Sequence, residues 1–190
     1  MPGFAAVTSA AERWDIINFV RARAAGVMSR QVGPEVSASA APAIPAFAFE
    51  TAGGQQTLSG VLGAGPALLV LFSGPPPTRR LAQLAAVQTS LAASGLKVVA
   101  IILDRPEPPD AEPTAPLVGV STGAAAALAL FRAPDDGGET DLLVDRSGDV
   151  RARWTARESS GVVTDRALTD AVDRVKNAPA EAQTHAGHTM

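Results

Sequence analysis

The side chains in this sequence that could bind a metal ion are gathered at the C-terminus. The last six residues hold both histidines of the chain, His185 and His188, together with Met190. Imidazole nitrogen and thioether sulfur suit copper, above all cuprous ion, and this spacing could close the three side chains around one metal. Because the tail offers few ligands and no second shell to orient them, the alternative is a tail that binds no metal. A cuprous titration of the full chain against a chain cut after Ala178 separates the two hypotheses.

Thiol chemistry is excluded, because the chain contains no cysteine. Disulfides, thiolate nucleophiles, iron–sulfur clusters and covalent haem attachment all need that residue. Ser73 is a poor nucleophile, since the histidines lie in the tail and no base is placed to activate it. Arg79 and Arg80 follow at the predicted start of a helix, where free amides and the helix dipole could hold an anion. The alternative, which we favour, is that both arginines are solvated.

Composition sets the broad class of the protein. The 190 residues carry a formal net charge of −3, and no run of Lys or Arg marks a nucleic-acid partner. No stretch approaches the roughly 20 apolar residues that span a bilayer. The N-terminus has no basic region followed by an apolar one, so it does not predict a secretory signal. Expressed as written, the chain would remain in the cytoplasm.

The N-terminal region predicts a helix and a linker. Ser9 and Glu12 form a capping-box pair, and apolar residues spaced by three and four predict a helix over Ser9–Ala25. Gly26 is the predicted end of this helix. Val32–Pro45 is rich in Ser, Ala and Pro without a period, which predicts a linker.

An opening hairpin and a central strand follow. Phe47 and Phe49 alternate as on one face of a strand, and Gly53-Gly54 predicts a turn to a short return strand through Thr57-Leu58. Ala67–Phe72 is an unbroken apolar run, which is typical of a strand covered on both faces. We therefore expect the middle of a sheet at this run.

A helix and a parallel strand complete a βαβ unit. Thr78 is the predicted cap of a helix that Gly95 stops, and Val98–Leu103 is a second apolar strand. A right-handed crossover should make the two strands parallel. The Pro-rich stretch Arg105–Pro116 predicts a loop, and Leu117–Val120 a short strand.

The second half of the chain predicts a closing hairpin between two helices. Ser121 or Thr122 is the expected cap of a helix over Gly123–Phe131. Asp141–Val144 and Val150–Trp154 flank a turn and predict two antiparallel strands. A last helix, capped by Thr164, has an apolar face formed by Leu168, Val172 and Val175.

This order of elements resembles the thioredoxin-like proteins of the redoxin and membrane-tethered thiol-reductase type. Leu68–Phe72 resembles the central strand of that family, and Leu142–Trp154 looks like its closing hairpin. The resemblance covers Pro45 to about Lys176. It implies an α/β fold, in which a thioredoxin-like mixed sheet is flanked by helices, with Ser9–Ala25 as an extra N-terminal helix.

The loop that carries the chemistry of this family is degenerate here. The family has two cysteines separated by two residues at the start of the helix, where the dipole lowers the pKa of the first thiol. The proline that faces those cysteines is also missing, with Glu139-Thr140 near that point. The resemblance therefore implies a non-catalytic module, and a thiol oxidoreductase or peroxidase is a disfavoured alternative. The degenerate active-site loop consists of Pro75, Pro76, Pro77, Thr78, Arg79 and Arg80.

The N-terminus resembles a different family. Met1-Pro2-Gly3-Phe4, followed by the helix that bears Trp14, is similar to the end of a c-type cytochrome domain. The resemblance implies that Met1 takes the axial-ligand position of a haem. The Cys-x-x-Cys-His attachment motif would lie upstream, so this chain as given does not hold haem covalently. The alternative is that Ser9–Ala25 is an extra helix packed on the domain.

The whole layout resembles the C-terminal part of copper-resistance D-type membrane proteins. It divides the chain into a cytochrome c remnant at 1–26, a linker at 27–45, a thioredoxin-like domain at 46–177 and a disordered His/Met tail at 178–190. The implied function is partner binding, or support of electron transfer in a neighbouring domain of a periplasmic protein. No cofactor is expected in this chain, although a longer parent protein would carry haem c and copper. Copper handling by the tail is the alternative function.

Overall fold

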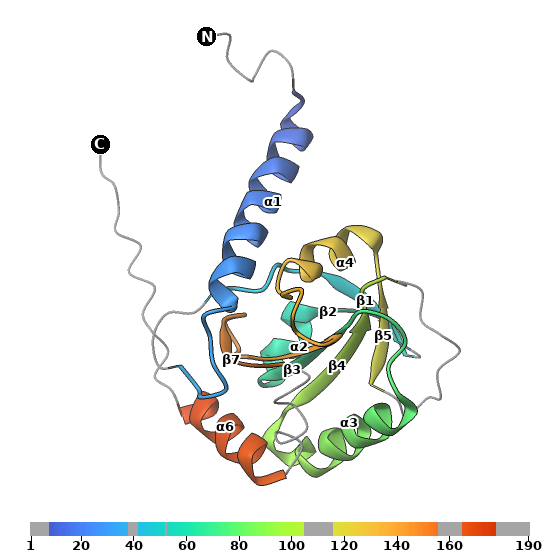
Figure 1. Ribbon diagram of the computed structural model, residues 1–190, viewed down its shortest axis with the longest axis vertical. Coiled ribbons are helices and arrows are strands. Elements are labelled where there is room, and N and C mark those ends of the chain that lie inside the picture. Colours follow the sequence, from blue (N-terminus) through green and yellow to red (C-terminus); the bar gives the residue numbers. More distant parts are fainter. Residues whose placement is uncertain (1–7, 38–41, 52, 105–115, 156–164, 178–190) are drawn as a thin grey trace.

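The computed structural model describes residues 8–37, 42–51, 53–104, 116–155 and 165–177 (Figure 1). The helices in this part of the chain are α1 (Ala10–Ser29), α2 (Leu58–Ala64), α3 (Thr78–Ser90), α4 (Thr122–Ala129) and α6 (Asp165–Asn177), with a 3₁₀ helix, η2, at Ala92–Ser94. The strands are β1 (Ala48–Thr51), β2 (Gly54–Thr57), β3 (Ala67–Phe72), β4 (Lys97–Ile102), β5 (Leu117–Val120), β6 (Glu139–Val144) and β7 (Val150–Thr155).

The described strands form one mixed sheet in the order β2-β1-β5-β4-β3-β6-β7. The predicted central strand is confirmed, because β3 lies between β4, with which it is parallel, and β6, with which it is antiparallel. The predicted hairpin of β6 and β7 is also confirmed. Together with the flanking helices, this sheet confirms the predicted thioredoxin-like α/β class with an extra N-terminal helix.

Alternating side chains of the strands point to opposite faces of the sheet and belong to two hydrophobic layers. On one face, residues such as Leu69 and Leu71 of β3 pack with α2 and α4. On the other face, Leu68 and Val70 pack with α3 and α6. Every residue of β3 is buried, because both faces are covered. Figure 1 shows α3 and α6 together on the side of the sheet away from α1 and α4.

Helix α1 begins as predicted and ends later than predicted. The capping box is confirmed, with the Glu12 amide 3.2 Å from Ser9 Oγ and the Ser9 amide 2.7 Å from Glu12 Oε2. The expected stop at Gly26 is wrong, since the helix continues to Ser29. Gly26 is a packing residue, because a Cβ there would lie only 2.4 Å from the carbonyl oxygen of Leu130.

Parts of the predicted linker are held against the domain. Ile44 is buried, and its amide donates to the Gly148 carbonyl at 2.8 Å. Ala43 forms an isolated antiparallel bridge with Asp149. The Ser37 amide donates to the Arg151 carbonyl at 2.8 Å. The predicted linker therefore makes regular backbone contacts with the domain at these positions.

Three local predictions need correction, and one choice that the sequence left open is resolved. The return strand ends at Thr57, which caps the unpredicted helix α2 by accepting a hydrogen bond from the Gly60 amide at 3.1 Å. Thr78 is the first residue of α3 rather than its cap, and Pro77 stands at the cap position without a side-chain bond. Gly95, with φ of +76°, ends η2 instead of α3. Ser121, rather than Thr122, caps α4.

Several predicted features lie outside the described residues. They are Met1, most of the Arg105–Pro116 loop, the Thr164 cap, and the tail with His185, His188 and Met190. Within the described part, no helix is both long and apolar enough to cross a membrane. The same residues contain no group of three or more His, Asp or Glu that could hold a metal ion.

Candidate functional site

The degenerate loop lies at the junction of β3 and α3, as the sequence predicts. Strand β3 ends at Phe72, and the next two residues are fixed to their surroundings by backbone hydrogen bonds. The Ser73 amide donates to the Gly138 carbonyl at 2.9 Å, and the Gly74 amide donates to Asp104 Oδ1 at 2.8 Å. Pro75, Pro77, Thr78 and Arg79 are exposed above this junction. The prolines and Arg79 therefore stand at the strand-to-helix junction where the sequence resemblance implies the thiols of the thioredoxin-like family.

Arg80 is buried in an ion-pair cluster, which overturns the expectation that it is solvated. Its side chain turns under α3 to the start of β6, and the residue is only 8% exposed. Nε lies 2.5 Å from Glu139 Oε1, and Nη2 lies 2.6 Å from Asp141 Oδ2. We call Arg80, Glu139 and Asp141 the junction cluster. Because two carboxylates already engage the guanidinium, Arg80 does not offer a free cation to an anionic ligand.

The junction cluster holds more acid than its single arginine can satisfy. Burial, helped by the nearby Glu139 carboxylate, raises the pKa of Asp141 to about 8 against the lowering effect of Arg80. Arg80 Nη1 and Asp141 Oδ1 are buried without a hydrogen-bond partner among the described residues. A carboxyl group that keeps its proton near neutral pH avoids part of the cost of a buried charge. The cluster can hold a proton, but none of its groups can exchange electrons.

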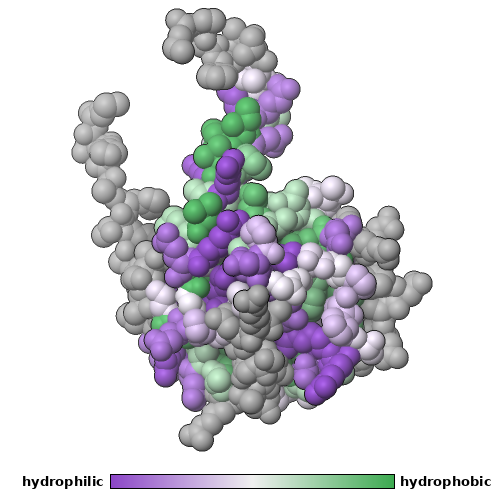
Figure 2. Space-filling view, viewed as in Figure 1, coloured by the Kyte–Doolittle hydropathy of each residue, from purple (hydrophilic) through white to green (hydrophobic). Residues whose placement is uncertain are grey.

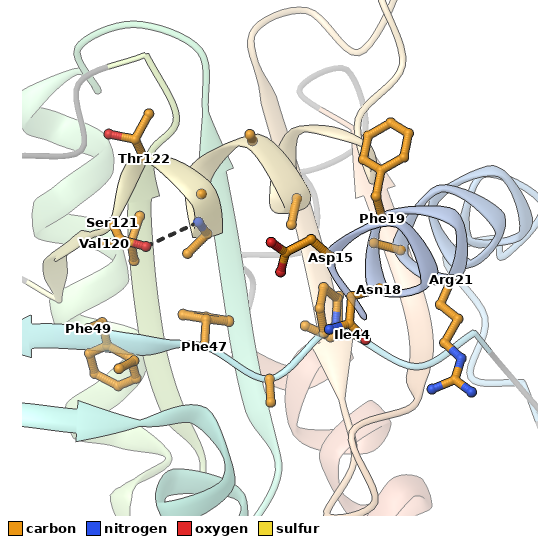
Figure 3. Close-up of a pocket in the computed structure, with 18 of the residues that line it drawn as sticks. Asp15, Asn18, Phe19, Arg21, Ile44, Phe47, Phe49, Val120, Ser121 and Thr122 are labelled. Atoms are coloured by element: carbon orange, nitrogen blue, oxygen red, sulfur yellow. Dashed lines mark hydrogen bonds between the residues drawn. The ribbon is translucent and has the colours of Figure 1, made fainter. Parts of the chain in front are cut away.

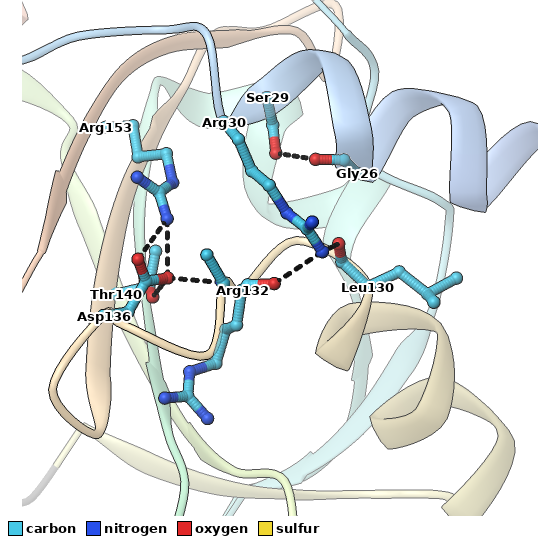
Figure 4. A network of polar contacts seen from close by, with 9 residues as sticks. Gly26, Ser29, Arg30, Leu130, Arg132, Asp136, Thr140 and Arg153 are labelled. Carbon is cyan, nitrogen blue, oxygen red and sulfur yellow. Dashed lines mark hydrogen bonds and ion pairs between the residues drawn. The ribbon is translucent and has the colours of Figure 1, made fainter.

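A second buried cluster lies on the other face of the sheet, near the end of α1 (Figure 4). Arg153 Nη2 lies 2.7 and 2.5 Å from the two carboxylate oxygens of Asp136. The Thr140 hydroxyl and the Ala133 amide also donate to Asp136 Oδ2, each at 2.7 Å. Burial raises the pKa of Asp136, but these hydrogen bonds and Arg153 together lower it below its usual value. We call Asp136, Thr140 and Arg153 the anchor cluster.

The anchor cluster adjoins the contacts that fasten α1. Arg30 Nη2 donates to the Arg132 carbonyl at 2.8 Å and to the Leu130 carbonyl at 3.3 Å, so it satisfies carbonyls just after α4 (Figure 4). The Arg153 amide donates to the Gly33 carbonyl at 3.0 Å. These bonds tie the segment after α1 to the sheet and to α4.

An open groove of about 1250 Å³ lies between α1, the start of β1 and α4 (Figure 3). Ile44, Phe47 and Phe49 contribute apolar surface on the sheet side, with the two phenyl rings 5.9 Å apart. Asp15 and Phe19 of α1 line the opposite side. The charged residues of the lining are Asp15, Arg21 and Glu50, and most of the other lining residues are apolar. The groove therefore offers mainly a surface for apolar contact.

Sequence reasoning found the junction and missed the residues that fill it. Arg80 was expected at the helix start, but its partners Glu139 and Asp141 lie about 60 positions further along the chain. One signal was available: Asp141 directly precedes the apolar run Leu142–Val144 in a predicted strand. An acid in such a strand is buried unless it lies at an edge, and a buried acid needs a cation.

The fold and the junction together define the class of structure: the chain has a thioredoxin-like fold whose redox position lacks thiols. No protein-family model and no curated protein sequence matches the chain. The fold class therefore stands on the architecture described above and on its likeness to solved structures.

Several of the similar solved structures are thiol:disulfide interchange proteins. A candidate thiol:disulfide interchange protein DsbE from Chlorobium tepidum superposes with a TM-score of 0.53 at 22% identity, covering 72% of this chain and 99% of that one. An interchange protein from Bacteroides sp. gives 0.52 at 13% identity, covering 79% and 97%. A thioredoxin family interchange protein from Chlorobium tepidum TLS gives 0.51 at 17% identity, covering 70% and 98%. At these identities the likeness shows the shared fold alone.

Proposed function

We propose that this protein is a non-catalytic thioredoxin-like module that works by binding a protein partner or a neighbouring domain. The observation that carries the proposal is the junction cluster, in which Arg80 is paired with Glu139 and Asp141 beneath a loop of prolines. Thiol exchange needs a thiolate at this place. A guanidinium held by two carboxylates supplies neither a nucleophile nor an electron carrier.

The proposal includes a neighbouring domain of the c-type cytochrome class, in an extracytoplasmic protein associated with copper resistance. It rests on the resemblance of residues 1–26 to the end of such a domain. The present chain does not fit a covalently attached haem of its own, because it has no cysteine and both histidines lie in the tail. Any haem would belong to the neighbouring domain. An in-frame Cys-x-x-Cys-His motif in the genomic DNA upstream of Met1 would support this arrangement, and an in-frame stop codon there would contradict it.

The lack of catalysis can be tested with a restored variant as the positive control. Pro75→Cys/Thr78→Cys places two thiols, separated by two residues, at the start of α3, where the helix dipole favours a thiolate. We expect the native chain to give no turnover in insulin-reduction and peroxide-consumption assays at micromolar protein. The restored variant should form a disulfide and reduce insulin above the level of the native chain.

The matched control is Pro75→Ser/Thr78→Ser, which makes the same changes in size without sulfur. It should be as inactive as the native chain and should unfold at a similar denaturant concentration. Turnover by the native, cysteine-free chain in either assay would overturn the proposal.

A further inference from the structure

Helix α1 exposes the large apolar side chains of the molecule to solvent. The helix is fastened only near its C-terminal end, where Ala22, Gly26 and Ser29 are its buried residues. Figure 1 shows its N-terminal part projecting from the body, and Figure 2 shows apolar side chains along the projection. Among the described residues, the large hydrophobic ones that are at least 40% exposed are all on this helix: Trp14, Ile16, Ile17, Phe19, Val20, Val27 and Met28.

The exposed apolar residues include a heptad seam. Ile17, Val20, Ala24 and Val27 are separated by three, four and three residues, which is the a/d spacing of a coiled coil. In this register Ala22 and Ser29 are f positions, directly opposite the seam. They are two of the three residues that α1 buries against the body. The body therefore holds the outer face of the helix and leaves the seam open.

We propose that this seam pairs with the same seam of a second copy of the chain, so that two α1 helices form a short parallel coiled coil. The large apolar residues at and beside the seam are 40–58% exposed, which is on the order of 600 Å² per chain and the low end of what a partner contributes to a specific interface. They are Trp14, Ile16, Ile17, Val20, Val27 and Met28. A patch of this size is rare on a protein that stays monomeric. The two bodies would lie on the outer sides of the pair, because each is attached at the f face. The inference does not rest on the non-catalytic role proposed above, but it competes with the proposed cytochrome neighbour for α1.

The charges beside the seam favour the parallel arrangement. Arg21 and Arg23 occupy the e and g positions, and the helix has no acid at either position from residue 14 to residue 28. In a parallel pair, position g faces position e five residues ahead, so Arg21 lies beside Ile16 of the other helix and Arg23 beside Met28. In an antiparallel pair, e faces e and g faces g. Each of the two arginines would then meet its own copy.

The first test compares two neighbouring residues on different faces of α1. Val20 is 57% exposed and lies on the seam, while Phe19 is 54% exposed and lines the groove instead. Analytical ultracentrifugation of the native chain should show a dimer at micromolar concentration. Val20→Glu should raise the dimer dissociation constant roughly a hundredfold. Phe19→Glu, which removes a larger apolar side chain, should leave it within about threefold.

The second test uses the absence of cysteine, because any introduced thiol is unique in the chain. Oxidation of Val20→Cys should give a disulfide-linked dimer, since d positions of parallel helices meet their own copies. Phe19→Cys should stay monomeric on the same non-reducing gel. Circular dichroism of each variant checks that α1 remains helical.

Three results would overturn the proposal. The first is a native chain that is monomeric at about 100 µM, which would leave the seam unpaired at any useful affinity. The second is a dimer that Phe19→Glu weakens more than Val20→Glu, because the groove rather than the seam would then be the interface. The third is a failure of Val20→Cys to cross-link while Val20→Cys/Ala24→Cys cross-links readily, which would show antiparallel helices.

Discussion

The two buried arginine clusters differ in how well their charges are matched. In the anchor cluster, one arginine meets one carboxylate, and Asp136 also accepts hydrogen bonds from a hydroxyl and an amide. In the junction cluster, one arginine meets two carboxylates, and Asp141 keeps a buried oxygen without a partner among the described residues. The pKa of Asp136 is lowered, whereas burial raises that of Asp141.

This difference separates a cluster with balanced charges from one at the candidate site. The matched cluster fixes a loop, a strand and the segment after α1, and its one carboxylate balances its one guanidinium, although Arg153 Nε is buried without a partner among the described residues. The mismatched cluster lies at the junction of β3 and α3, and it fills the space with groups that are only partly satisfied. Local rules of stability are relaxed most often at functional sites. The junction keeps that character although it has no thiols.

The largest effect should come from breaking the matched cluster. Asp136→Asn removes the charge that neutralises Arg153, and an arginine cannot escape by losing its proton. We expect a loss of about 3–5 kcal/mol in the free energy of unfolding at pH 7. Urea unfolding followed by circular dichroism measures it. A loss below about 1 kcal/mol would mean that the cluster is not structural.

A smaller loss is expected when the arginine of the junction cluster is removed. Arg80→Met keeps most of the buried volume. Because Asp141 can remain protonated, only the Glu139 carboxylate is left as an unpaired charge. The free energy of unfolding should fall by about 1–3 kcal/mol in the same urea titration. If Arg80→Met cost as much as Asp136→Asn, the contrast between the two clusters would disappear.

The clearest pH dependence is expected for Asp141→Asn. The native carboxyl, with a pKa near 8, keeps a proton that the unfolded chain releases near 3.8. Its contribution to stability is therefore full below about pH 4 and declines as the pH rises to about 8. The amide has no such decline, so Asp141→Asn should gain stability relative to the native chain between pH 5 and pH 9. Thermal unfolding across that range measures the difference.

Asp136 supplies the opposite case for the same experiment. Because its pKa is lowered in the folded protein, its contribution is present above the unfolded pKa of about 3.8 and is lost as the pH falls below it. Asp136→Asn should therefore show its largest deficit at neutral pH and a smaller one in acid. Parallel pH profiles for the two variants would contradict the assignment of opposite shifts.

Local sequence signals predicted the framework of this fold well. The capping box of α1, the apolar run of β3 and the hairpin of β6 and β7 depend on neighbouring residues, so their patterns are complete in the sequence. Helix α2 was missed because its seven residues include Gly60 and Gly63, which weaken a helical pattern.

Long-range contacts explain the other errors. Gly26 is a typical stop signal, yet it is required here for close packing against Leu130. Arg80 is a typical solvated residue of a first helical turn, yet it is buried by acids that follow about 60 residues later. Neither partner can be identified from the residues nearby, because the fold itself brings them together.

Because α1 is held near its C-terminal end, a small tilt of the helix moves its N-terminal end by several ångströms. With a rise of 1.5 Å per residue, Ala10 lies about 24 Å from the contact at Gly26. A tilt of about 10° at that contact would swing the far end by about 4 Å. The close backbone contact at Gly26 and the hydrogen bonds of Arg30 thus fix the direction of the helix axis. They thereby also fix the position of any group attached to the N-terminal end of α1.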